Sequence, residues 1–202
     1  MEISFSKNKI EFEKELNSLD KFVIDFCSVL NKLKIKYVII AGYVAILFGR
    51  NRNSEDIDIF IDDIDFNKFK ILWTRLLGEF ECVNTNDVHD AFKTYLQEIN
   101  QIRFSRKNNP VPNMEIKKAK DSTDWWSLNN RKKVILNNSE LFVSPFEIQI
   151  AYKLYLGSEK DIEDARFLYK LFKDKIDIKL LQSFNRKFNI EDRFREYVNG
   201  TT

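Results

Sequence analysis

Histidine, cysteine, glycine and proline are all scarce in this sequence of 202 residues. His89 is the only histidine and lies in the loop-like context NDVHDAF, which excludes histidine-based catalytic triads and histidine-rich metal sites. Cys27 and Cys82 are too few to build a disulfide framework. With 5 glycines, 3 prolines and 44% hydrophobic residues, the chain fits neither disordered, collagen-like nor low-complexity classes.

Long uncharged apolar runs are also missing. The best one, residues 37–48, is too short to span a bilayer. The first fifteen residues mix charges from the start, which is atypical of a signal peptide. We therefore expect a soluble, cytoplasmic protein with no membrane partner. No glycine-rich phosphate loop of the P-loop or Rossmann type occurs, so those nucleotide-binding classes are excluded as well.

Charge is nearly balanced in total but unevenly distributed. Lysine and arginine number 33 and aspartate and glutamate 31, for a net charge of +2. Residues 54–65 hold six acids and no base, whereas residues 101–133 hold nine bases and three acids. An acidic block followed by a basic block is compatible with a cation site beside an anion-binding surface. Two solvated edges are the alternative interpretation.

Hydrophobic periodicity predicts an α+β fold: a mixed β-sheet core flanked by helices, followed by a helical C-terminal region. We expect one core domain over residues 1–143 and a helical region over 144–202. Helices are expected at 7–35, 42–49, 65–80 and from 144 onward, and strands at 37–41, 56–61, 95–105, 113–118, 132–136 and 141–143. The last two strands would form a hairpin through Asn137 and Asn138.

The segment Asp56-Ile57-Asp58-Ile59 carries the most chemistry. Alternate residues of a strand face the same way, so Asp56 and Asp58 project together while the isoleucines face the core. Neighbouring carboxylates repel each other unless a cation lies between them, and hard oxygen ligands favour Mg²⁺ or Mn²⁺. Such a pair suits two-metal phosphoryl chemistry. Taken alone, an Asp-x-Asp pattern is more simply interpreted as the solvated edge of a strand.

The joint pattern is more specific than any single feature. An apolar strand ends at Gly42, a short helix follows, and Arg-x-Ser precedes Asp-Ile-Asp-Ile. This pattern resembles the DNA polymerase beta-like nucleotidyltransferase superfamily, and is most similar to the toxin-type nucleotidyltransferases of AbiEii and MenT systems. The matching positions are Gly42, Ala45, Arg52, Ser54, Asp56 and Asp58. The resemblance implies a nucleotidyltransferase core over 1–143, with 144–202 completing the active-site cleft.

The resemblance also implies roles for residues further along the chain. Glu115, between Met114 and Ile116, matches a third catalytic carboxylate. Lys153 matches a lysine that contacts nucleotide phosphates, and Asp161 an acid that follows it; without the family these would be a solvated lysine and a first-turn helix acid. The implied catalytic and metal-binding residues are Asp56, Asp58 and Glu115, with Mg²⁺ or Mn²⁺. The implied nucleotide-binding residues are Gly42, Arg52, Ser54, Lys153 and Asp161.

The implied activity is metal-dependent transfer of a nucleoside monophosphate from a nucleoside triphosphate, such as ATP, to an acceptor hydroxyl. The toxin-type resemblance favours RNA or tRNA as the acceptor, with the basic block binding phosphates, and implies an antitoxin protein as a partner. A protein hydroxyl or a small molecule remains an open alternative, as does the oligomeric state. Tyr43 stands where the family has Gly or Ser, so the other function class is a catalytically impaired nucleotide-binding or interaction module with the same fold.

Overall fold

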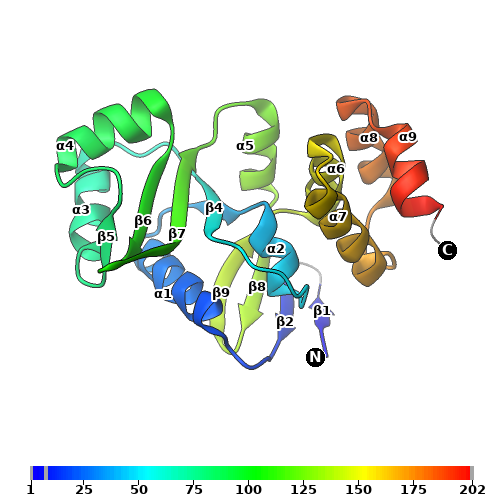
Figure 1. Cartoon of the computed structure of the whole chain (residues 1–202), viewed down its shortest axis with the longest axis horizontal. Coiled ribbons are helices and arrows are strands. Elements are labelled where there is room, and N and C mark those ends of the chain that lie inside the picture. Colours follow the sequence, from blue (N-terminus) through cyan, green and yellow to red (C-terminus); the bar gives the residue numbers. More distant parts are fainter. Residues whose placement is uncertain (1, 7–8, 201–202) are drawn as a thin grey trace. The chain divides into compact units, whose positions relative to one another are not determined.

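The computed structural model describes residues 2–6 and 9–200 (Figure 1). The chain divides into two units with separate interiors. Unit 1 comprises Met1–Ile40 and Asn53–Val143, and unit 2 comprises Ala41–Arg52 and Ser144–Thr202. The short segment 41–52 therefore belongs with the C-terminal helices, although strands of unit 1 flank it in the sequence. Within the described ranges, every helix is too short or too polar to span a membrane.

Unit 1 is built on one mixed sheet. Among the described residues its strands are β1 (Ser4–Ser6), β2 (Lys9–Phe12), β3 (Tyr37–Ile39), β4 (Asp56–Ile61), β5 (Phe80–Cys82), β6 (Ile102–Arg106), β7 (Asn109–Lys118), β8 (Lys132–Leu136) and β9 (Ser139–Val143). Their order across the sheet is β1-β2-β8-β9-β3-β4-β7-β6-β5. Strand β4 runs antiparallel to β3 and parallel to β7. This places β4 and β7, which carry the predicted carboxylates, side by side.

Helices cover both faces of this sheet (Figure 1). The helical segments of unit 1 are α1 (Ser18–Lys32), α3 (Phe66–Leu76), α4 (Val88–Asp90), the π-helical segment η1 (Ala91–Ile99) and α5 (Ser122–Asn129). Phe26 of α1 and Trp73 of α3 both pack on Phe104 of β6, with ring centroids 6.0 and 5.8 Å away. On the other face, Leu128 of α5 packs on Val38 of β3. The predicted carboxylates of β4 and β7 lie on this second face.

Unit 2 is helical. Its elements are α2 (Gly42–Leu47), α6 (Phe146–Leu156), α7 (Glu159–Phe172), α8 (Ile178–Phe188), α9 (Glu191–Phe194) and the π-helical segment η2 (Arg195–Asn199). The rings of Phe146 and Phe172 stack at 4.0 Å, and Phe48 meets Phe172 edge-on at 4.9 Å. Gln149 Nε2 also donates to the carbonyl of Ala41 at 2.7 Å. These contacts fix α2 against α6 and α7.

The predicted fold class is confirmed, and so are several elements. Strand β4 spans residues 56–61 as expected, and β8 and β9 form the expected hairpin. Asn137 and Asn138 both have positive φ, 45° and 68°, which two-residue hairpin turns require and asparagine tolerates. Ser158 begins α7 as predicted, because its side chain accepts from the backbone N–H of Asp161.

The expected helix over 7–35 is wrong at its start. Residues 9–12 form β2, which pairs in parallel with β8 and buries Ile10 and Phe12 on alternate positions. Helix α1 begins only at Ser18 because Asn17 caps it. Asn17 Oδ1 accepts from Asp20 N at 2.8 Å, and Asp20 Oδ2 accepts from Asn17 N at 3.2 Å. Residues 7 and 8 lie outside the described residues.

The expected strand over 95–105 is wrong in its first half. Residues 91–99 form the π-helical segment η1, and β6 starts only at Ile102. The apolar residues of η1 explain the difference, since Phe92 contacts Phe66 and Phe69 of α3 with ring centroids 5.4 Å apart. His89, expected in a loop, lies in the short helix α4 and stacks on Phe66.

Candidate active site

Three predicted carboxylates lie on one polar face of the sheet of unit 1. Asp58 of β4 is directly opposite Glu115 of β7, and Asp56 is opposite Asn113. Paired residues of adjacent strands project to the same face, so these side chains share it. Ile57 points the other way and is fully buried. Asp56 is exposed, Asp58 is half-buried and Glu115 is 4% exposed. The alternation of residues along β4 therefore puts Asp56 and Asp58 on the same face of the sheet as Glu115.

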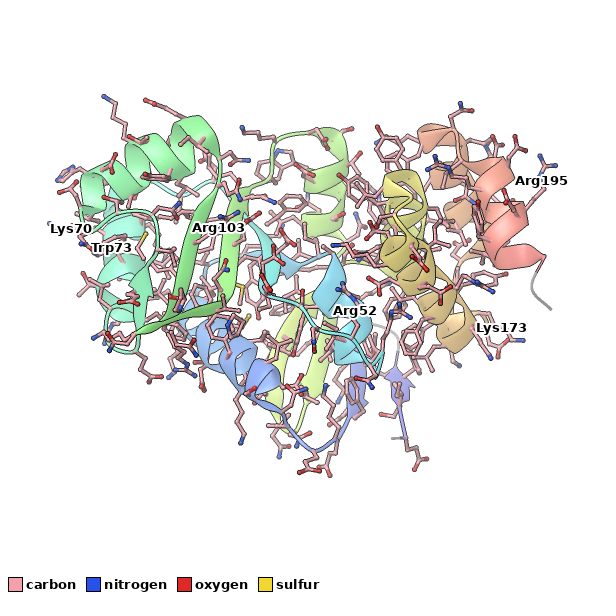
Figure 2. The ribbon with its side chains drawn as sticks, in the orientation of Figure 1. Arg52, Lys70, Trp73, Arg103, Lys173 and Arg195 are labelled. Carbon is pink, nitrogen blue, oxygen red and sulfur yellow. The ribbon has the colours of Figure 1, made fainter. Side chains whose placement is uncertain are left out.

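Glu115 is already engaged by three side chains of the chain itself. Its Oε2 accepts from Gln101 Nε2 at 2.5 Å and from Arg103 Nε at 2.9 Å. Its Oε1 lies 2.5 Å from Lys117 Nζ, which also reaches Asp58 Oδ1 at 3.1 Å. Arg103, labelled in Figure 2, comes from β6, where it is paired with Glu115. Lys117 thus bridges two of the three predicted metal ligands.

These contacts shift the pKa values in opposite directions. Burial raises the pKa of Asp58; Lys117 offsets this in part, and the charges of Glu115 and Asp56 raise it further. Burial acts to raise the pKa of Glu115 too, but the hydrogen bonds from Lys117 and Arg103 prevail and lower it to about 2. Burial acts to lower the pKa of Lys117, yet Glu115 and Asp58 together raise it. Lys117 is therefore held as a cation, whereas burial favours the neutral form of Asp58.

The donor set of this face fits a hard divalent cation. Asp56 and Asp58 offer carboxylate oxygens one strand step apart, and hard divalent cations prefer such oxygen ligands. Across the described residues, however, no group of three or more His, Cys, Asp or Glu side chains is arranged to hold one metal ion. The oxygens of Glu115 are bound by Arg103, Gln101 and Lys117. As placed here, the two aspartates fit a metal better than Glu115 does.

Ser54 lies at the start of the same strand. Its Oγ donates to the backbone carbonyl of Asp56 at 2.8 Å. This bond stabilises the turn that leads into β4. It engages the backbone of Asp56 and not its carboxylate. Both residues belong to unit 1.

A second charged cluster, which we call the Asp164 cluster, is buried inside unit 2. It consists of Arg50, Arg52, Lys153, Asp161 and Asp164. Asp164 is fully buried and pairs with Arg50 Nε at 2.6 Å, Arg52 Nη2 at 3.1 Å and Lys153 Nζ at 2.9 Å. Lys153 Nζ also contacts Asp161 Oδ1 at 2.6 Å. With 3% exposure, Lys153 is not the solvated lysine of an amphipathic helix.

Asp161 is held from two sides within the Asp164 cluster. Burial acts to raise its pKa, but the hydrogen bonds from Lys153 and Ser158 outweigh burial and lower it. Ser158 is the capping residue of α7, so the cap and the ion pair share one carboxylate. Asp161 is therefore more than the first-turn acid that a helix dipole would favour.

Gly42 makes room for Arg52. A Cβ added at Gly42 would stand 1.9 Å from Arg52 Nη2, so the guanidinium would have to shift to accommodate any other residue there. The guanidinium, labelled in Figure 2 beside α2, thus lies directly over the glycine. Gly42 stays a predicted nucleotide-binding residue, and in the structure its close neighbour is Arg52 of the chain itself. Tyr43, the departure from the family pattern, is fully buried.

The comparisons with known proteins bear on the fold. No family model and no curated protein matches this sequence. Among solved structures, an antigenic nucleotidyltransferase-like protein from Paracoccidioides brasiliensis superposes with a TM-score of 0.50 at 17% identity, over 91% of this chain and 95% of that one. The lincosamide antibiotic adenylyltransferase LnuA, bound to lincomycin, gives 0.51 at 14% identity, over 78% and 99%.

A third neighbour is ANT(2")-Ia in complex with adenylyl-2"-tobramycin. It gives a TM-score of 0.53 at 13% identity, over 85% of this chain and 99% of that one. The first two are described as a nucleotidyltransferase-like protein and an adenylyltransferase, and the third holds an adenylylated tobramycin. This chain has a nucleotidyltransferase fold. Identities this low establish the fold and leave the reaction to be argued from the site.

Within this nucleotidyltransferase fold, the predicted residues fall into two groups. Asp56, Asp58, Glu115 and Ser54 lie in unit 1, whereas Gly42, Arg52, Lys153 and Asp161 lie in unit 2. Lys117 was missed as a candidate, and Asp164 ends the stretch Lys160–Asp164 that matches the family's Arg/Lys-Asp-x-x-Asp motif but was given no role of its own. Strand parity offered a signal for Lys117, because it lies two residues after Glu115 on β7 and must share its face. Asp164 carried the weaker signal of lying three residues after Asp161 on a helix.

The basic block is largely neutralised by the chain itself. Five of its nine bases form ion pairs with carboxylates of unit 1: Arg103, Arg106, Lys117, Lys118 and Lys133. Arg131 also lies over the ring of Phe142, 3.8 Å from its centroid. These contacts engage part of the block within unit 1, and phosphate binding by the block stays a prediction.

Proposed function

We propose that this chain is a metal-dependent nucleotidyltransferase that moves a nucleoside monophosphate from a nucleoside triphosphate to an acceptor hydroxyl. The observation that carries the proposal is the placement of Asp56 and Asp58 side by side on β4, on the polar face of a nucleotidyltransferase-fold sheet. A solvated strand edge does not account for Asp58, because that carboxylate is half-buried next to a second, buried carboxylate.

Asp56 and Asp58 would hold Mg²⁺ or Mn²⁺, and Glu115 would add an oxygen once Lys117 withdraws from it. When bound, such ions activate the acceptor hydroxyl and stabilise the charge of the transferred phosphoryl group. The chain's own part is to keep Asp58 ionised and aimed. Backbone pairing of β4 with β7 aims Asp58, and the nearby Lys117 acts to lower its pKa and so favours the ionised form.

The motif resemblance assigns binding of the triphosphate to Lys153, Arg52 and Ser54. The motif resemblance assigns Lys153 to the phosphates as a compact point charge, and a phosphate would compete there with Asp161 and Asp164 for its ammonium. Arg52 offers a planar fork, held over Gly42 by Asp164. Asp161 would orient Lys153 rather than touch the nucleotide itself.

The acceptor is assigned here only as a hydroxyl. RNA or tRNA, and an antitoxin partner, follow from the toxin-type motif resemblance. Two fold neighbours are an adenylyltransferase bound to lincomycin and an enzyme bound to an adenylylated tobramycin. Small polyhydroxylated acceptors therefore belong in the same assay as RNA.

The deciding experiment incubates the chain with each labelled nucleoside triphosphate, Mg²⁺ and either total RNA or aminoglycoside and lincosamide mixtures. We expect label transfer in at least one combination. Asp56→Asn and Asp58→Asn should each cut transfer about 100-fold or more, the size of effect seen when one transition-state electrostatic partner is removed. Asp63→Asn, in the same acidic block but 71% exposed, is the matched control and should transfer normally.

Two results would contradict the proposal. Near-wild-type transfer by either aspartate variant would show that the pair is not the metal site. Thermal stabilisation by a triphosphate with Mg²⁺, without transfer to any acceptor, would instead favour the nucleotide-binding module without catalysis.

A further inference from the structure

Lys117 lies between Glu115 and Asp58 on the polar face. It follows Glu115 by two residues on β7, so both side chains project to the same face. Its Nζ lies 2.5 Å from Glu115 Oε1 and 3.1 Å from Asp58 Oδ1. The ammonium therefore binds one oxygen from each of two predicted metal ligands, on two adjacent strands.

The charges of this face show what Lys117 changes. Arg103 and Glu115 form a contact pair at 2.8 Å and cancel each other. Asp56 and Asp58 then leave two negative charges, which match one divalent ion. Lys117 reduces this to one negative charge and binds Asp58 directly. With a divalent ion bound, the charges of Asp56, Asp58 and the ion sum to zero only if Lys117 has moved away from them.

A metal ion and the ammonium of Lys117 would compete for the carboxylate of Asp58. Metal–oxygen bonds in such sites are about 2.0–2.6 Å long, so an ion on Asp58 would stand a few ångströms from Nζ. Two cations at that distance repel each other strongly in a partly buried site. The lysine stem is long and the side chain is 30% exposed, so Lys117 has room to move away.

We infer that Lys117 is a built-in competitor for the divalent ion and thereby sets the metal affinity of this site. The inference rests on the proposed function for its metal site but adds a residue that acts against binding. Lys117 keeps the carboxylates neutralised while the site is empty and must leave Asp58 before a metal binds. It is a residue that tunes the metal site, not a ligand.

The test measures Mn²⁺ binding by electron paramagnetic resonance in the absence of nucleotide, on the full chain. Lys117→Met keeps the stem and removes the charge, and Lys117→Gln is a second variant in case the first folds poorly. Lys118→Met is the matched control, because Lys118 is the next residue, pairs with Asp63 and Gln97 and projects to the other face. It changes net charge equally but not this face.

Loss of the competing cation should tighten Mn²⁺ binding about tenfold or more in both Lys117 variants, and Lys118→Met should match wild type. In metal-free buffer Lys117→Met should melt below wild type, because two carboxylates lose their partner, and Mn²⁺ should stabilise it more. Unchanged or weaker Mn²⁺ binding in folded Lys117 variants would overturn the inference while leaving the metal site intact. No Mn²⁺ binding by wild type or by any variant would overturn the metal site as well.

Discussion

At Ala41 the chain carries a methyl group in a backbone conformation that suits glycine better. Its φ is 58° and its ψ is −135°, at the junction between β3 and α2. L residues adopt this conformation at a cost of order 1–3 kcal/mol, and such strain persists only where the surroundings impose it. Here the carbonyl of Ala41 is held by Gln149 Nε2.

Ala41→Gly should therefore stabilise the chain. Relief of strain exceeds the added entropy of the unfolded chain, for a net gain of about 1 kcal/mol. The measurement is urea unfolding followed by circular dichroism. Ala45→Gly is the control, because it lies in α2 with helical geometry and should lose about 1 kcal/mol or more. A destabilised Ala41→Gly variant would show that the conformation at 41 is unstrained.

At the scale of elements, Asp164 of α7 joins three segments of unit 2. It binds Arg50 and Arg52 after α2 and Lys153 of α6. Removing one partner of a buried charge network leaves the others uncompensated, which costs far more than the network contributes as a whole. Three buried or half-buried cations depend on this carboxylate and on Asp161.

Asp164→Asn should accordingly destabilise the chain by about 3–5 kcal/mol. Glu163→Gln is the neighbouring control: its side chain is 45% exposed, so its ion pairs should contribute below about 1 kcal/mol. Thermal and urea unfolding of both variants provide the comparison. Equal stabilities for the two would mean that the Asp164 cluster is not essential for the packing of unit 2.

At the scale of the whole molecule, stability should fall at alkaline pH. Burial raises the pKa of the Cys27 thiol to about 12 from 9.0, and burial also raises the pKa of Tyr37. Both groups stay neutral in the folded chain while the unfolded chain ionises. The stabilisation is therefore fully present below about pH 9 and is lost as pH rises toward the folded pKa values.

Melting temperatures between pH 7 and pH 11 test this expectation. Above pH 9.0 for Cys27 and above pH 10.0 for Tyr37, each group should cost about 1.4 kcal/mol of unfolding free energy per pH unit. Cys27→Ala should melt lower at pH 7, because it leaves a cavity in α1, but should show a shallower alkaline decline. Identical declines in the two proteins would exclude Cys27 as a source. The thiol should also resist alkylation at pH 8 until the chain unfolds.

The sequence by itself determined those features that depend on local rules. Alternation over 56–61 is enough to put Asp56 and Asp58 on one face, and two asparagines with tolerance for positive φ are enough to set the β8–β9 hairpin. Ser158 and Asp161 likewise specify the start of α7 within four residues. In each case the deciding interactions lie within one element or one turn.

Only the tertiary structure decided which charges meet. Residues 9–12 form a strand because β8, more than a hundred residues later, offers a partner edge, and no local pattern encodes that pairing. Lys153 is buried because Asp161 and Asp164 reach it from the next helix. Glu115 is engaged because Arg103 and Lys117 converge on it from two strands. Burial and ion pairing depend on distances across the fold, and periodicity within one segment does not specify them.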